Sequence, residues 1–326
     1  MLVAAAREGR RLERARRREG EDEVIRSAPG NMPTHPVYVI SKGRHDCCLT
    51  ARFLIADGVP FRLVVEPQER ELYEKEFGGA KLCTIVETPF SNLGLGGIPA
   101  RNFVWDHAKA LGVERHWILD DNIRKMYRHY RGKNLPCAAG PAFEACEAFV
   151  ARYSNVAIAG MNYDTFASAT SSGGALPPFY LNARVYSCLC IDNALPFRWR
   201  GRYNEDTDLC LQAISRGLCT VLINAFLIGK VATMTMKGGN SAQLYQGDGR
   251  LKMARSLEKQ WPGVVRTTRK FKRPQHHIDW TRFDNRLKPK PGVRIDRRPN
   301  ERGMVVEAVA EVKSPRLKAM IARRKS

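Results

Sequence analysis

The chain has 326 residues, of which 44% are hydrophobic, with 13 Phe, 10 Tyr and 5 Trp; this suffices for one large domain with a core and excludes a disordered protein. Its formal net charge at pH 7 is +21. It contains no run of 18 apolar residues, so no membrane-spanning helix is expected, and its charged start lacks the apolar run of a secretory signal.

Residues 1–30 alternate Arg and Glu, which predicts a charged N-terminal arm that is either helical or disordered. A β/α alternation follows, in which short apolar runs predict buried strands and the stretches between them predict helices. The predicted strands are residues 37–40, 61–65, 82–86 and 116–119, and the predicted helices are residues 46–57, 67–77 and 99–111. This order predicts a mostly parallel sheet with helices on both faces.

Beyond residue 140 the pattern is less regular. Residues 142–152, 206–216 and 241–260 are predicted helices, residues 156–161 and 219–223 are predicted strands, and residues 180–191 are rich in strand-forming side chains. Residues 164–178 are small and polar, which predicts a loop.

Two polar segments follow predicted strands of the first half. Ser41-Lys42-Gly43-Arg44 follows the first strand, and Asp120-Asp121-Asn122 follows the fourth. In parallel α/β sheets, ligands bind beyond the carboxyl ends of the strands, so both segments are candidates for one site. Adjacent carboxylates suit a divalent cation that bridges to phosphates, but Asp also favours helix N-caps, and both explanations stay open.

A second acidic segment, Asn204-Glu205-Asp206-Thr207-Asp208, precedes an apolar helix. The acids either complement the helix dipole or supply a general base. Lys42, Arg44 and Arg101 lie at turns on the same expected edge of the sheet, where they either bind phosphate or are ordinary surface cations. Lys237-Gly238-Gly239 is weak evidence for a flap over a diphosphate.

Competing motifs are missing from the sequence. It contains no P-loop, no complete dinucleotide-binding glycine motif, and no G-x-S-x-G or H-E-x-x-H. Nine scattered cysteines without C-x-x-C are expected of a protein in a reducing cytoplasm, and Cys188 and Cys190 are interpreted as core residues.

The positive charge is concentrated at the C-terminal end. Residues 264–326 carry 19 Lys and Arg against 6 Asp and Glu, which predicts a basic extension beyond a domain at residues 31–263. Such a region either contacts a polyanion or only aids solubility. Because Phe271 stands among cations, nucleic acid is the predicted partner. The candidate contacts are Arg266, Arg269, Lys270, Lys272 and Arg273.

Together these motifs resemble GT-A glycosyltransferases. More narrowly, the segments 38–44, 118–123 and 204–208 are similar to the TET-associated glycosyltransferase family of tailed phages, over residues 35–265. The resemblance implies a GT-A (Rossmann-like) mixed, mostly parallel sheet and a hexosyltransferase activity with a nucleotide-sugar donor. It also implies a cytoplasmic location, in the host cell if the chain is phage-encoded.

The resemblance further implies roles for individual residues. Asp120 and Asp121 would hold Mn²⁺ or Mg²⁺, although Asn122 stands where many relatives have a third acid. Asp206 would be the base of an inverting reaction, with Glu205 in support. The residues that would bind the donor are Ser41, Lys42, Gly43, Arg44, Arg101, Asn102, Asp120, Lys237, Gly238 and Gly239.

The acceptor that the resemblance implies is a hydroxymethylated pyrimidine in phage DNA. Two alternatives remain: a GT-A enzyme that acts on a glycan, lipid or protein, and a catalytically silent relative that only binds nucleic acid.

Overall fold

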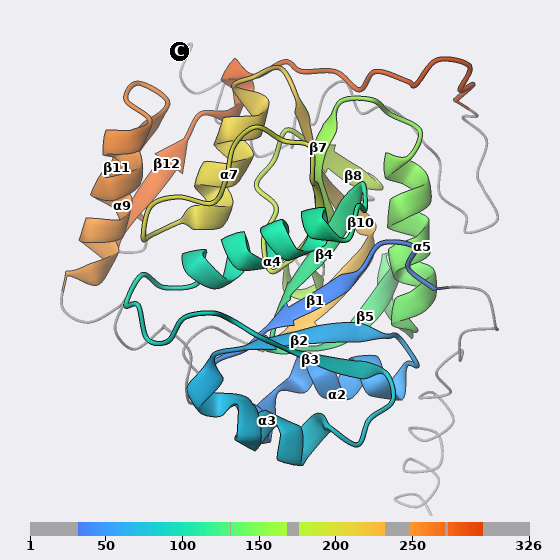
Figure 1. Ribbon diagram of the computed structural model, residues 1–326. Coiled ribbons are helices and arrows are strands. Elements are labelled where there is room, and N and C mark those ends of the chain that lie inside the picture. Colours follow the sequence, from blue (N-terminus) through green and yellow to red (C-terminus); the bar gives the residue numbers. More distant parts are fainter. Residues whose placement is uncertain (1–31, 131, 168–175, 232–247, 271–272, 296–326) are drawn as a thin grey trace, which may run out of the picture.

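The computed structural model describes residues 32–130, 132–167, 176–231, 248–270 and 273–295. These residues form one ten-stranded sheet and a separate two-stranded hairpin (Figure 1). In sheet order, the strands are β3 (Cys83–Glu87), β2 (Phe61–Val65), β1 (Val37–Ile40), β4 (Arg115–Asp120), β9 (Cys188–Asp192), β7 (Val156–Tyr163), β10 (Cys219–Lys230), β5 (Ile123–Tyr130) and β6 (Lys133–Cys137), and β8 (Phe179–Leu181) pairs with β10. The hairpin consists of β11 (Val265–Lys270) and β12 (Arg273–Ile278).

The first four strands along the chain that were predicted from the β/α alternation, β1 to β4, are parallel neighbours. The strands of the second half pair antiparallel, except that β7 and β10 are parallel. The predicted α/β class, a mixed central sheet flanked by helices, is therefore confirmed.

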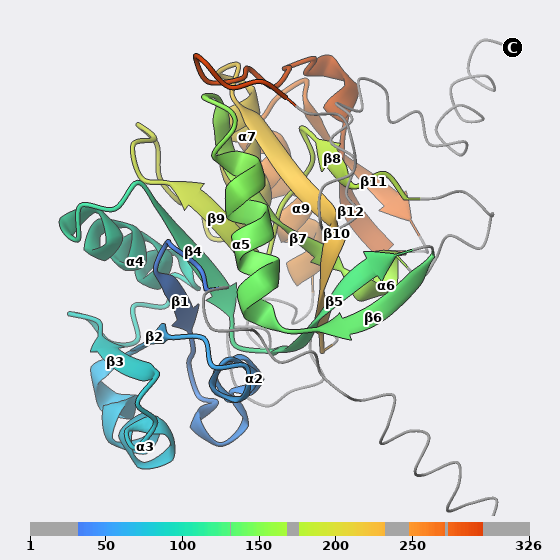
Figure 2. The same ribbon diagram turned by 90° about the vertical axis from the view of Figure 1, so that its right-hand side faces the viewer.

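Helices cover both faces of the sheet, and Figure 2 shows α5 lying along one of them. The α-helices are α2 (Leu49–Ala56), α3 (Arg70–Phe77), α4 (Ile98–Ala110), α5 (Ala139–Val150), α6 (Asp164–Ala167), α7 (Glu205–Ile214) and α9 (Gly249–Gln260), and the 3-10 helices are η1 (His45–Cys47), η2 (Pro67–Glu69) and η3 (Trp280–Arg282). Within the described residues, none of the helices is long and apolar enough to cross a membrane.

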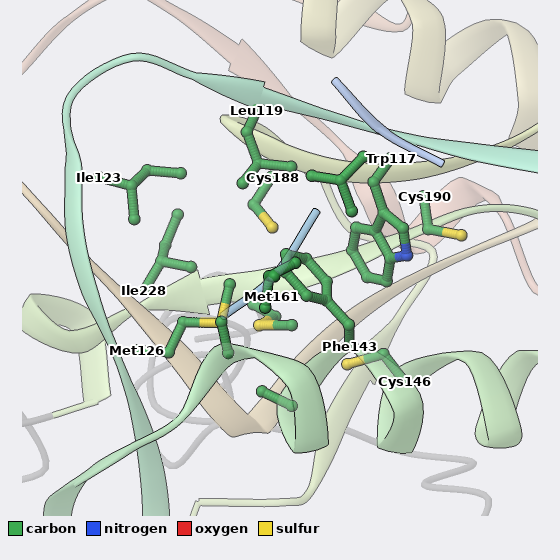
Figure 3. Packing of buried hydrophobic residues seen from close by; sticks show 14 of the residues in the cluster. Trp117, Leu119, Ile123, Met126, Phe143, Cys146, Met161, Cys188, Cys190 and Ile228 are labelled. Atoms are coloured by element: carbon green, nitrogen blue, oxygen red, sulfur yellow. The ribbon is translucent and has the colours of Figure 1, made fainter. Parts of the chain in front are cut away.

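The core has two layers because successive strand residues point to opposite faces. In β4, Trp117 and Leu119 pack with α2, α3 and α5, whereas Ile118 packs with α4 and α7. Figure 3 shows the first layer, in which the Trp117 ring lies edge-on to Phe143 with the ring centroids 4.8 Å apart. Cys188 and Cys190 are fully buried in this layer, which confirms their prediction as core residues.

Two strands, β5 and β6, lie in a stretch that the apolar pattern did not assign. Their sequences, IRKMYRHY and KNLPC, carry many charged or polar side chains because β6 forms an edge of the sheet. β10 is longer than its predicted strand at residues 219–223 and continues to Lys230, which becomes important at the site. In the predicted loop at 164–178, residues 164–167 form the short helix α6.

The folded region continues past residue 263, where the sequence placed the end of the domain. Val265 and Ile278 of the hairpin are buried with Leu211 and Ile214 of α7 and Leu257 of α9. Further on, Asn285 donates to the carbonyl oxygens of Ile214 and Leu218. The described residues of 265–270 and 273–295 thus include several that pack on the sheet domain, and the basic hairpin has a fixed place beside α7.

Gly160 of β7 offers a stability prediction. A Cβ added there would collide with the carbonyl oxygen of Cys188 and lie 2.5 Å from Cγ1 of Val185. Because backbone is one of the obstacles, Gly160→Ala should lower the free energy of unfolding by about 1–3 kcal/mol, measured by urea denaturation. Gly79→Ala is the control, since nothing lies within 4 Å of its added Cβ. Equal stabilities of the two variants would contradict the close packing of β7 on β9.

Candidate active site

Strand register brings the two polar segments of the first half together. β1 and β4 are parallel neighbours in which Ile40 pairs with Asp120, so the turn that starts at Ser41 adjoins Asp120 and Asp121. The carboxyl end of β10 reaches the same edge, since Lys230 donates to Oδ2 of Asp120 at 2.7 Å. This edge of the sheet is therefore the candidate site.

Five charged residues converge here, which we call the Asp120 cluster. Arg101 of α4 donates to Oδ1 of Asp120 at 3.0 Å, and Lys230 takes the other oxygen. The start of α7 adds Glu205 and Asp206, whose carboxylates lie 3.9 and 3.8 Å from Arg101. The cluster thus places three carboxylates around two cations from four different elements.

Arg101 is the centre of the cluster. Its side chain is only 5% exposed, and its guanidinium lies over the Trp199 ring, 4.7 Å from the centroid. Nε and Nη1 of Arg101 donate no hydrogen bond to any described residue, and Oδ1 of Asp206 accepts none. Nε and the Asp206 oxygen still have ion-pair contacts, with Glu205 and with Nη2 of Arg101, which leaves Nη1 as the atom of the three without a contact among the described residues. Because buried polar atoms in native proteins nearly always have partners, Nη1 is a candidate donor to a polar ligand.

The pKa values of two acids of the cluster, Asp206 and Asp120, are shifted in opposite directions. Burial raises the pKa of Asp206 to about 7, since Arg101 opposes this effect only in part and Glu205 adds to it. Burial also acts to raise the pKa of Asp120, but Lys230 and Arg101 outweigh it and hold that pKa below its usual value. At neutral pH, Asp120 is therefore a fixed anion, whereas Asp206 can take up and release a proton.

Asp121 points away from this cluster into a separate set of contacts. It accepts hydrogen bonds from Ser41 Oγ at 2.8 Å and from Arg44, and Ser41 also bonds the Tyr73 hydroxyl at 2.7 Å. Burial raises the pKa of Asp121, against the effect of Arg44. These contacts join the turn after β1 to the end of β4 and α3, which is a structural task.

The predicted Mn²⁺ or Mg²⁺ was tested against these donors. Both oxygens of Asp121 are bonded to Arg44 and Ser41, and both oxygens of Asp120 are bonded to cations. Within the described part of the chain, no group of three or more His, Cys, Asp or Glu residues is placed to hold a metal ion. The side chains as arranged do not fit a divalent cation, and its role stays a prediction.

The other predicted donor-binding residues lie around this edge. Lys42 is paired with Glu66 at 2.7 Å, and the backbone N–H of Gly43 donates to Glu69 at 2.8 Å. Asn102 donates to the carbonyl oxygen of Trp199 at 3.0 Å and so helps to hold the ring beneath Arg101. Lys237, Gly238 and Gly239 lie outside the described residues.

Asp208 ends the second acidic segment but has a different environment from Asp206. It is fully buried and accepts hydrogen bonds from Arg200, Gln212 and Trp261 Nε1, the last at 2.7 Å. In the same region, Asn204 donates to the carbonyl oxygen of Met253 at 2.9 Å. Asp208 and Asn204 therefore connect the start of α7 to α9.

Sequence reasoning missed Lys230, Ser187 and Tyr163. Lys230 donates to Ser187 Oγ at 2.7 Å, and the Tyr163 hydroxyl also bonds Ser187, at 2.6 Å. The one available signal was a lysine at the end of a long apolar run, which is too common to single out. Lys230 reaches the site because β10 pairs with β5 and β7, and this pairing cannot be read from the sequence.

The predicted nucleic-acid contacts lie on the hairpin, except that Lys272 is outside the described residues. By strand alternation, Arg266 and Lys270 share one face with their register partners His277 and Arg273, while Val265 and Ile278 face α9. Arg266, Lys270 and Arg273 are exposed. His276 of β12 lies 3.5 Å from Arg184, so the hairpin borders the main sheet domain.

A sequence model of the family described as TET-Associated Glycosyltransferase matches residues 35–239. The match covers β1, β4, α4, the start of α7 and the end of β10, and hence every member of the Asp120 cluster. A search of curated proteins gave no significant match.

Proposed function

The chain belongs to the TET-Associated Glycosyltransferase family and is therefore a glycosyltransferase, and we propose that it moves a sugar from a nucleotide-sugar donor to a hydroxymethylated pyrimidine in DNA. The observation that carries the proposal is the Asp120 cluster. Buried cations beside a carboxyl that can take up a proton at neutral pH match a reaction that has an anionic leaving group and a hydroxyl nucleophile.

In the proposed reaction, Asp206 is the base. The bond between the anomeric carbon and the diphosphate oxygen breaks, and its electron pair goes to the diphosphate. The acceptor hydroxyl oxygen bonds to that carbon, and its proton passes to Asp206, whose pKa of about 7 suits this task at neutral pH. The reaction thus inverts the anomeric centre.

Nη1 of Arg101, which donates no hydrogen bond to a described residue, is proposed to bind the diphosphate, on which negative charge develops. Trp199 keeps the guanidinium in place by stacking. Glu205 raises the proton affinity of Asp206. The divalent cation predicted from the sequence remains a prediction, and no step of this mechanism passes through it.

DNA is proposed as the acceptor because of the outer face of the hairpin. Arg266, Lys270 and Arg273 are exposed there, and such a strip of cations can neutralise phosphates. In duplex DNA, the modified base would leave the stack to reach Asp206, at a cost of a few kcal/mol. Phosphate contacts on the hairpin would offset this cost.

The direct test is mass spectrometry of hydroxymethylcytosine DNA after incubation with the protein and a panel of donors that includes UDP-glucose. A gain in mass equal to one sugar, not seen with unmodified DNA, is the expected result. Transfer only to a glycan, lipid or protein would reject the DNA acceptor. No transfer and no donor hydrolysis by folded protein would favour a silent nucleic-acid-binding relative.

Charge reversal on the hairpin gives a further prediction. Arg266→Glu/Arg273→Glu should weaken DNA binding and reduce the slope of log K against log salt by about one for each arginine, since each phosphate contact releases counterions. Fluorescence anisotropy over a salt series measures this. Lys75→Glu/Lys81→Glu is the control, because it changes the net charge by the same amount and both lysines are exposed, on α3 and just before β3, which lie away from the hairpin in both views (Figures 1 and 2). A slope unchanged by the double substitution would remove the hairpin from the DNA interface.

A further inference from the structure

Lys230 is a buried cation that belongs to none of the motifs identified in the sequence. It is the last residue of β10, and its side chain is only 13% exposed. Its ammonium lies 2.7 Å from both Asp120 Oδ2 and Ser187 Oγ, and 3.5 Å from the Tyr163 hydroxyl. Four elements, β4, β7, β10 and the segment before β9, thus fix the position of one positive charge.

Asp120 holds two cations side by side. Arg101 bonds one of its oxygens and Lys230 the other, although one cation is enough to neutralise a carboxylate. Removing a lysine from water is costly unless its charge is used. The nearby Asp121 forms an ion pair with Arg44. Arg101 is shared with Glu205 and Asp206, so the cluster has two cations for three carboxylates, and what distinguishes Lys230 is its place at the end of β10 between Asp120 and Ser187.

The same arrangement disfavours a metal ion. A divalent cation on Asp120 would lie beside two positive charges, and both oxygens of Asp121 are already bonded. The two cations lie beside Asp206, the proposed base, and Nη1 of Arg101 has no hydrogen-bond partner among the described residues. Under the proposed function, Lys230 and Arg101 would supply positive charge at this place.

We propose that Lys230, together with Arg101, binds the donor's diphosphate directly, so that donor binding needs no divalent cation. This inference rests on the proposed function. As the anomeric bond breaks and its electron pair moves to the diphosphate oxygen, the ammonium and guanidinium groups stabilise the charge by hydrogen bonds. Asp120 and Ser187 keep the ammonium in place before the donor arrives, so little reorganisation is needed.

Calorimetry with UDP, GDP, CDP, ADP and dTDP, each in EDTA and again with Mn²⁺, tests the proposal without relying on turnover. The wild-type protein should bind at least one of them in EDTA, with a Kd that Mn²⁺ changes by less than about twofold. Lys230→Met should weaken that binding about 10- to 100-fold, the size of one lost charge-assisted hydrogen bond, and Lys230→Arg should retain most of it. The matched control is Lys125→Met, since Lys125 lies opposite Gly229 on the neighbouring strand and is exposed.

Lys230→Met leaves Asp120 without one partner, so the single variant could lose binding because it folds poorly. The double variant Asp120→Asn/Lys230→Met controls for this. It removes both charges, so it should fold, as judged by thermal unfolding, yet bind the nucleotide as weakly as the single variant. Wild-type binding that appears only with Mn²⁺, or a double variant that binds like wild type, would overturn the role of Lys230 and leave the proposed function standing. Wild-type protein that binds no nucleotide under either condition would reject both.

Discussion

Asp206→Asn is expected to lower the rate of sugar transfer by about 10²- to 10⁴-fold, the range that a positioned general base contributes. The amide keeps the shape of the side chain but cannot take the proton of the acceptor hydroxyl. Donor binding should change little, because the proposed diphosphate contacts belong to Arg101 and Lys230. The measurements are single-turnover transfer to modified DNA and calorimetry with the nucleotide.

The pH profile provides the control for this prediction. Burial raises the pKa of Asp206 to about 7, so wild-type turnover should rise as pH increases through 7, where the base loses its proton. Asp206→Asn should lack this rise. Glu205→Gln, one residue away, should keep the rise with its midpoint at lower pH, since Glu205 helps to raise the pKa of Asp206. A variant at Asp206 that keeps both the rate and the profile would remove it as the base.

Among the substitutions described here, Arg101→Met should lower the free energy of unfolding most, by about 3–5 kcal/mol. This is the cost expected when one partner of a buried ion pair is removed. Arg101 is 5% exposed and serves three carboxylates, of which Asp120 is bonded directly. Urea unfolding at pH 8 measures the loss. Arg198→Met is the matched control: its guanidinium also lies 4.7 Å from a tryptophan centroid, but its partner Asp106 is an exposed surface acid, so the cost should be clearly smaller.

The loss at Arg101 should also depend on pH. A carboxyl whose folded pKa is raised, as for Asp206, favours the folded state in its protonated form, and this contribution is lost as pH rises through the folded pKa. Without Arg101, the ionised form of Asp206 costs more, so the deficit of the variant should grow between pH 5 and pH 8. A deficit that stays constant over this interval would show that Asp206 is not coupled to Arg101.

The first half of the fold could be predicted because its local signals agree. Apolar runs of four or five residues predicted β1, β2 and β4, and the parallel order then placed Ser41 and Asp120 at one edge, which the register of Ile40 with Asp120 confirms. The family resemblance rested on three short segments, and the match over residues 35–239 confirms it. Where hydrophobic pattern and topology coincide, sequence is sufficient.

What could not be predicted depends on tertiary structure. Adjacent acids look alike in sequence, yet Asp120 and Asp121 point to different partners because consecutive residues at the end of a strand face opposite ways. Lys230 contacts Tyr163 and Asp120, which lie 67 and 110 residues away along the chain, and only the folded sheet brings them together. The hairpin was taken for part of an extension, since its charged outer face hides Val265 and Ile278, which pack inward.

The start of α7 is joined to the central sheet as well as to α9. Leu209 and Cys210 of α7 pack with Ile118 of β4, while Asp208 and Asn204 connect the helix to α9, whose Leu257 packs with the hairpin. Continuous packing therefore runs from the sheet edge that carries Asp120 and Lys230 to the basic hairpin. Under the proposed roles, substitutions on the outer face of the hairpin are expected to change which acceptor is bound and to leave the Asp120 cluster as it is.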